Sequence, residues 1–193
     1  MELQNLCIKL FAEDSSTVEI LDFVPLFHRW IKEQSVAEHL LIDVADYSHV
    51  WNGPGIILVA HQANFNMDQE TGRLGLLYQR KQPVEGDLPQ RLRFLINTTL
   101  HICERLQSAP ELDGKLRFGG QEMLIQSNDR MRAPHSEESH KILESALADS
   151  LQTLYGNSSF TVARGNDTKS RPTLTVLGKQ AVDIQTLLDR TGS

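Results

Sequence analysis

The chain has 193 residues, of which 40% are hydrophobic and 23% charged, a balance typical of a folded globular protein rather than a disordered one. Its length fits one domain, and no apolar run approaches the roughly 18 residues that a membrane-spanning helix needs. The net charge of −6 disfavours binding to a phosphate backbone.

Basic residues form no extended patch in the sequence. Arg91 with Arg93 and Arg130 with Arg132 come nearest to one, and no aromatic stacking surface accompanies either pair. Acidic residues gather early, since residues 1–50 carry three Lys or Arg against nine Asp or Glu. We therefore expect no nucleic-acid partner.

The N-terminal segment and the cysteines indicate a cytoplasmic protein. Glu2 stands where a secretory signal peptide would carry basic residues, and Lys9 interrupts the apolar stretch that follows. Cys7 and Cys103 show no paired spacing, which favours buried thiols in a reducing compartment. We expect no membrane partner.

In the first half of the chain, short apolar runs alternate with turn signals. Asp22 can cap a helix, and its buried stripe would consist of Leu26, Phe27, Trp30 and Ile31. The turn signal at residues 53–55 precedes a continuous apolar run. We predict a loop at residues 68–72 and strands at residues 6–11, 40–44, 56–60 and 74–78.

The second half begins with the most regular helical pattern. That helix starts after Asp87, and a second starts at Ser136 and ends before Gly156. The pair Gly119-Gly120 suits a two-residue hairpin turn. We predict strands at residues 115–118, 121–126, 160–163 and 173–177, and a short terminal helix at residues 183–188.

These elements predict an α+β fold in the order β-α-β-β-β-α-β-β-α-β-β-α. Strand pairs joined by short turns imply a largely antiparallel sheet, with three main helices packed on one face. We expect residues 1–193 to form a single domain. A weak helix–hairpin recurrence covers residues 87–127 and 136–178, although no residue pattern repeats with it.

Titratable side chains gather between residues 28 and 68, where aromatic residues are interleaved with them. Histidine and carboxylate together suit Zn²⁺, Mn²⁺ or Fe²⁺, because imidazole and a hard oxygen can share one coordination shell. The candidates for a ligand pocket are His28, Asp43, Asp46, His49 and His61.

Structural roles account for the same residues. Asp43 at a strand end can bond neighbouring backbone, Asp46 can form an Asx turn, and His49 can lie in a solvated loop. His28 can hydrogen-bond a neighbouring strand. No metal-binding, phosphate-binding, dinucleotide-binding or nucleophile-elbow motif occurs, so we expect no metal and no cofactor.

An alternation of Asn64, Asn66, Asp68 and Glu70 superficially resembles a calcium-binding loop. It lacks the glycine at the sixth position and the distal bidentate glutamate of such loops. Strand alternation would instead place these four side chains on one solvated face.

Four segments resemble a family of uncharacterised bacterial proteins of about this length. They are FHRWI at residues 27–31, LLIDVADYSHV at residues 40–50, GPG at residues 53–55 and GRLGLLY at residues 72–78. The resemblance is best over residues 1–125. The family has no established activity, so it assigns no catalytic residue and implies only a bacterial, cytosolic, stand-alone protein.

Two hypotheses about function remain open. The first is a non-enzymatic interaction or accessory protein, homo-oligomeric or bound to another protein, which the missing catalytic motifs and the open sheet favour. The second is a small-ligand or metal-binding protein, or an enzyme, with a pocket around the five His and Asp candidates. The sequence favours the first.

Overall fold

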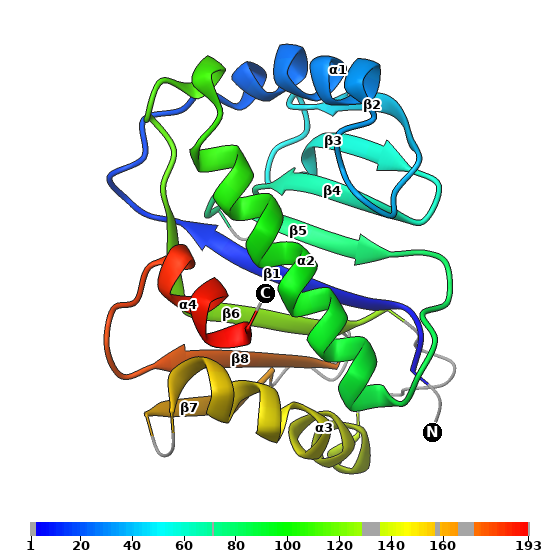
Figure 1. Cartoon of the computed structure of the whole chain (residues 1–193), viewed down its shortest axis with the longest axis vertical. Coiled ribbons are helices and arrows are strands. Elements are labelled where there is room, and N and C mark those ends of the chain that lie inside the picture. The colour runs from blue at the N-terminus through cyan, green and yellow to red at the C-terminus, as the bar shows by residue number, and fades with distance from the viewer. Residues whose placement is uncertain (1–2, 71, 129–135, 157–158, 166–171, 193) are drawn as a thin grey trace.

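Eight strands form one antiparallel sheet in the computed structural model, which describes residues 3–70, 72–128, 136–156, 159–165 and 172–192 (Figure 1). Their order across the sheet is β2-β3-β4-β5-β1-β6-β8-β7. Arg130 and Arg132 lie outside the described residues. The strands are β1 (Leu6–Ala12), β2 (Leu41–Tyr47), β3 (Gly55–Ala60), β4 (Ala63–Asp68), β5 (Gly75–Arg80), β6 (Phe118–Ser127), β7 (Phe160–Arg164) and β8 (Thr173–Gly178).

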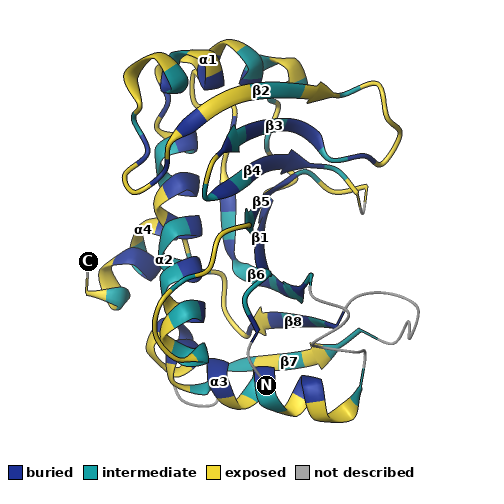
Figure 2. Ribbon diagram, turned by 90° about the vertical axis from the view of Figure 1, so that its right-hand side faces the viewer, coloured by how far each residue is buried: buried dark blue, intermediate teal, exposed yellow. Residues whose placement is uncertain are grey.

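The helices of the described chain all lie on one side of this sheet. The sheet is curved, and the helices cover its convex face while its concave face carries none of them (Figure 2). The prediction of an α+β fold with an antiparallel sheet is therefore confirmed, but four helices rather than three pack on the covered face. They are α1 (Phe23–Glu33), α2 (Leu88–Gln107), α3 (Glu137–Tyr155) and α4 (Ile184–Thr191).

Local sequence determines where three of these helices begin. The Asp87 side chain accepts a hydrogen bond from the Gln90 amide at the start of α2, while the Gln90 side-chain oxygen accepts one from the Asp87 amide. Ser136 caps α3 and Asp183 caps α4 through equivalent bonds. Each side chain satisfies a backbone N–H that has no partner within its helix.

The hairpin predicted at Gly119-Gly120 is wrong, because both glycines lie within the single strand β6. The Gly120 amide donates to the Val182 carbonyl, and the Tyr155 hydroxyl donates to the Gly120 carbonyl. A Cβ atom at Gly120 would lie 2.6 Å from the Val182 oxygen. This glycine therefore permits close approach of another segment and forms no turn.

Strand β4 was not predicted, and its discovery corrects the order of elements to β-α-β-β-β-β-α-β-α-β-β-α. Residues 56–60 pair with β4, and β4 in turn pairs with β5, so two short hairpins replace the single one expected. The solvated face expected for the Asn and Asp alternation is also wrong. Asn66 and Asp68 are buried, and Asp68 forms an ion pair with Lys9 of β1.

The hydrophobic core fills the space between the convex face and the helices. Trp30 of α1 and Tyr78 of β5 are among its largest fully buried side chains. Segments 87–127 and 136–178 hold α2 with β6 and α3 with β7 and β8, respectively. In the described part of the chain, no helix combines the length and the apolar character needed to cross a membrane.

Candidate functional site

The five predicted site residues lie at one end of the sheet and are all exposed. His28 is on α1, Asp43 and Asp46 are on β2, His49 is in the turn between β2 and β3, and His61 follows β3. His49 and His61 thus stand at opposite ends of β3, a strand of six residues and so about 20 Å long. These two histidines do not line one cavity.

The aspartates of this group bond to nearby backbone. Asp46 accepts a 2.8 Å hydrogen bond from the Ser48 amide, which forms the Asx turn that the sequence suggested. Hydrogen bonds from Ser48 hold the pKa of Asp46 below its ordinary value. Asp43 accepts a 2.8 Å bond from the Val44 amide. Among the described residues, no three His, Cys, Asp or Glu side chains are placed to hold a metal ion.

The same end of the sheet carries an unusual concentration of exposed apolar side chains. Of the seven large hydrophobic residues that are exposed in the described chain, five fall within residues 40–51. Trp51 is 90% exposed at the turn between β2 and β3. We call this group the apolar edge, and its members are Leu40, Ile42, Tyr47, Val50 and Trp51.

Two members of the apolar edge, Ile42 and Tyr47, lie on β2, which has one partner strand in the described part of the sheet. Strand β2 pairs with β3 on one side and is the first strand in the sheet order. At its start the free edge of β2 is covered, since the Gln34 side chain accepts from the Leu41 amide and donates to the Leu41 carbonyl, and helix α1 packs against the strand. An edge strand of this kind can pair with a strand of another chain.

Acidic side chains accompany the apolar edge in the sequence. Glu38, Asp43 and Asp46 are exposed along it, and no Lys or Arg occurs between residues 36 and 52. The surface therefore combines apolar contact area with negative charge.

A cleft of about 610 Å³ adjoins the start of the apolar edge. Residues 35–39, which lead into β2, form one wall, and the C-terminal half of α2 forms the other. Arg105 of α2 fastens the two walls together, because it donates to the Ser35 carbonyl and lies 4.7 Å from the centre of the Trp30 ring. Histidine and glutamate side chains line the opening: Glu38, His39, His101 and Glu104.

His39 is the buried histidine of this cleft and sits in a chain of hydrogen bonds. Its Nδ1 donates to the Ala37 carbonyl at 2.8 Å, and its Nε2 accepts from the Tyr78 hydroxyl at 2.9 Å. Arg80 in turn donates to the Tyr78 oxygen. Burial lowers the pKa of His39 and raises that of Tyr78, because a charged ring would lose its hydration. This chain of hydrogen bonds, together with burial, keeps the His39 imidazole neutral.

The concave face carries a second group of buried polar residues. Lys9 pairs with Asp68 and also donates to the Arg73 carbonyl at 3.2 Å. The side-chain oxygens of Asn64 and Asn66 are buried and have no hydrogen-bond partner. The Lys9 charge is therefore compensated by Asp68, whereas the oxygens of the two neighbouring amides have no hydrogen-bond partner.

Sequence reasoning pointed to the right region but to the wrong property of it. The titratable residues there are exposed and bond locally, whereas the apolar residues between them are exposed without covering. His39 was missed because a lone histidine carries no motif. Its one signal was its place between Val36 and Leu41, two residues that the core buries.

Comparison of the chain with protein-family models and with curated proteins finds no match.

Proposed function

We propose that this protein is a non-enzymatic interaction protein that binds a partner protein through the apolar edge. The observation that carries the proposal is the 90% exposure of Trp51 among four other exposed apolar side chains. Exposed apolar side chains gathered on one part of a surface mark interaction sites in folded proteins, and tryptophan, tyrosine and arginine are enriched among the residues that contribute most to binding.

Charge indicates the chemistry of the partner. Glu38, Asp43 and Asp46 have no basic neighbour in the same stretch, so a partner segment rich in Lys or Arg would gain favourable contacts. A second copy of this chain would instead bring three further acidic side chains to the contact. We therefore favour a basic, apolar segment of another protein over a homo-oligomer.

The edge position of β2 supports binding in an extended conformation. A strand added beside β2 would receive main-chain hydrogen bonds, and its alternate side chains would meet the apolar edge. Gln34 already occupies the backbone groups of Leu41. The Asp43 side chain occupies the Val44 amide, so the added strand would pair with the remaining backbone groups of β2 between Leu41 and Tyr47.

The proposal retains the predicted cytoplasmic location. Cys7 and Cys103 are both buried and form no disulfide bond, and thiols persist in reducing compartments. A bacterial source, which the sequence resemblance implies, stays a prediction.

Tryptophan fluorescence tests the proposal with a synthetic peptide in which lysine alternates with valine and phenylalanine. Trp30 is fully buried and Trp51 is exposed, so a blue shift on titration reports burial of Trp51. We expect a saturable shift that weakens as salt is added. A matched peptide with glutamate in place of lysine should give none.

Paired variants separate charge from fold. Asp43→Asn with Asp46→Asn should weaken binding of the lysine peptide by about twofold to thirtyfold, because two exposed charge pairs are lost. Glu85→Gln with Glu138→Gln, which changes two exposed acids elsewhere, should not weaken it. Equal shifts with both peptides, or no shift, would contradict the proposal. A blue shift that grows with protein concentration in the absence of peptide would show that the apolar edge binds a second copy of this chain instead of another protein.

A further inference from the structure

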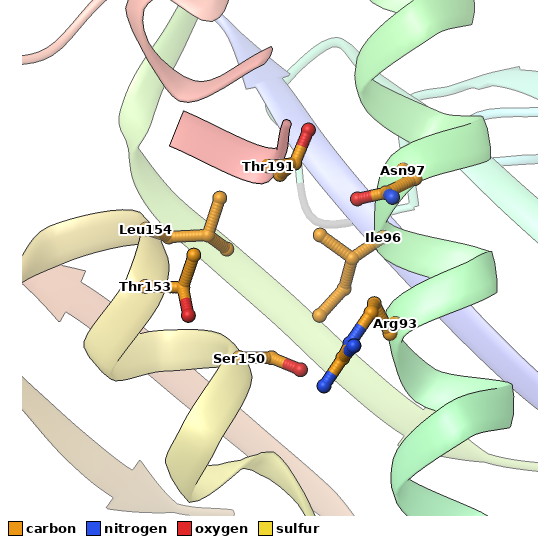
Figure 3. A pocket seen from close by; sticks show the side chains of 7 residues that line it. All are labelled: Arg93, Ile96, Asn97, Ser150, Thr153, Leu154 and Thr191. Carbon is orange, nitrogen blue, oxygen red and sulfur yellow. The ribbon is translucent and has the colours of Figure 1, made fainter. Parts of the chain in front are cut away.

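A cavity of about 120 Å³ lies where α2, α3 and α4 meet, on the side of the sheet opposite the concave face (Figure 3). Helix α2 contributes Arg93, Ile96 and Asn97, while α3 contributes Ser150, Thr153 and Leu154, and Thr191 ends α4. Because one water takes up about 30 Å³ in the liquid, the cavity holds about four waters or one small organic molecule.

The cavity has a cationic end. The Arg93 side chain reaches from α2 toward the Ser150 hydroxyl on α3 (Figure 3). Arg93 is exposed and forms no ion pair with any carboxylate of the described residues. A guanidinium with free donors beside a hydroxyl donor is the arrangement that binds a carboxylate.

The other end of the cavity accepts hydrogen bonds. The Asn97 side-chain oxygen is buried, has no partner, and points toward the gap between α2 and α4 (Figure 3). Thr191 lies across that gap, and its hydroxyl donates to the Leu188 carbonyl at 2.8 Å. A buried acceptor without a partner is costly, and a ligand donor would satisfy it.

Apolar side chains separate the two ends. Ile96 and Leu154 face each other across the middle of the cavity (Figure 3). None of the described residues that line the cavity carries a carboxylate, so the acceptor end suits a neutral hydroxyl better than an ammonium group, whose charge would be desolvated without compensation. From one end to the other, the cavity thus presents a cation, an apolar wall and a hydrogen-bond acceptor.

We propose that this cavity binds a short carboxylate with a hydroxyl group at its far end. The carboxylate would pair with Arg93 and Ser150, the carbon chain would contact Ile96 and Leu154, and the hydroxyl would donate to the Asn97 oxygen. This site is separate from the apolar edge and does not depend on it.

Nuclear magnetic resonance titration of the full chain with β-hydroxypropanoate tests the proposal. We expect saturable shifts of the Arg93 and Asn97 side-chain N–H signals, with a dissociation constant on the order of 1 mM for a ligand of this size. Propanoate, which lacks the hydroxyl, should bind about tenfold more weakly, and propanol, which lacks the charge, should give no saturable shift. β-Alanine should bind more weakly than β-hydroxypropanoate.

Variants assign each end of the ligand. Arg93→Gln should weaken both carboxylates about tenfold or more, whereas Arg117→Gln, which removes an exposed arginine outside the cavity, should leave them unchanged. Asn97→Leu should lower the affinity for β-hydroxypropanoate to that for propanoate without weakening propanoate itself. Ser150→Ala provides a second test of the cationic end if Arg93→Gln lowers the melting temperature.

Three results would overturn the proposal. Shifts confined to other parts of the protein would place the ligand elsewhere. Equal affinities for β-hydroxypropanoate and propanoate in the unaltered protein would remove the role of Asn97. The absence of saturation would mean that the cavity holds water only.

Discussion

Lys9 of β1 reaches across β5 to form a buried ion pair with Asp68 of β4. Gly75 of β5 stands opposite both Phe11 and Asp68, and a Cβ atom there would lie 2.8 Å from the Lys9 Cε. The missing side chain at Gly75 therefore leaves Lys9 its path over the sheet. The Lys9–Asp68 ion pair thus depends on a glycine at residue 75.

Removing one member of the pair should destabilise the fold strongly. Lys9→Met leaves the buried Asp68 carboxyl without its ion-pair partner, and we expect the free energy of unfolding to fall by about 3–5 kcal/mol in urea denaturation. The double variant Lys9→Met with Asp68→Leu should recover most of that loss, because no buried charge remains. Lys141→Gln, which breaks an exposed pair with Glu137, should cost less than about 1 kcal/mol. Similar losses for Lys9→Met and Lys141→Gln would refute the assignment.

A methyl group at residue 75 should act through the same pair. In Gly75→Ala the new Cβ would stand 2.6 Å from the Leu10 carbonyl oxygen as well as close to Lys9. We expect a loss of about 1–3 kcal/mol in the free energy of unfolding, since neighbouring groups must shift. Gly119→Ala is the matched control, because its nearest contact would be 3.7 Å. Equal melting temperatures of the two variants would argue against the tight packing at Gly75.

The two tryptophans should separate stability from surface. Trp30→Ala empties a fully buried site and should cost about 3–5 kcal/mol of unfolding free energy. Trp51→Ala should change it by no more than about 0.5 kcal/mol, because that side chain is 90% exposed. Acrylamide quenching gives an independent reading: Trp51→Phe should remove most of the quenchable emission. A strongly quenchable Trp30 would contradict the structure.

Acid should weaken the fold through His39. Burial lowers the pKa of His39 from its ordinary 6.5, so below that pH the unfolded chain binds a proton that the folded protein does not. The stability associated with the neutral ring is present above about pH 6.5 and is lost as the pH falls toward the folded pKa. Unfolding in urea at about pH 7.5 and about pH 5 should show a smaller difference for His39→Gln than for the unaltered protein.

Two further variants sharpen this test. His28→Gln changes an exposed histidine and should keep the full pH dependence. Tyr78→Phe removes the hydroxyl that donates to His39 and should cost about 1 kcal/mol at neutral pH. An unaltered pH dependence in His39→Gln would show that other groups produce it.

Much of the fold followed from local patterns in the sequence. The helices predicted to start near Asp87, Ser136 and Asp183 do begin there, and the structure shows each of these side chains capping amides that are its neighbours along the chain. Apolar runs likewise predicted most strands, because the residues of such a run are neighbours along the chain. Local chemistry thus determined where elements begin and that the protein combines an antiparallel sheet with helices.

Tertiary structure alone decided which elements pair and which side chains remain uncovered. In the sequence Gly120 resembles a turn residue, but in the structure Val182 packs against it. The alternation at Asn64 and Asn66 resembles a solvated face, but in the structure Lys9 of β1 pairs with Asp68 on that face. An apolar run on an edge strand has the same sequence pattern as one in the hydrophobic core, because burial depends on neighbours that are distant in sequence. Both the apolar edge and the cavity between three helices arise from such distant contacts.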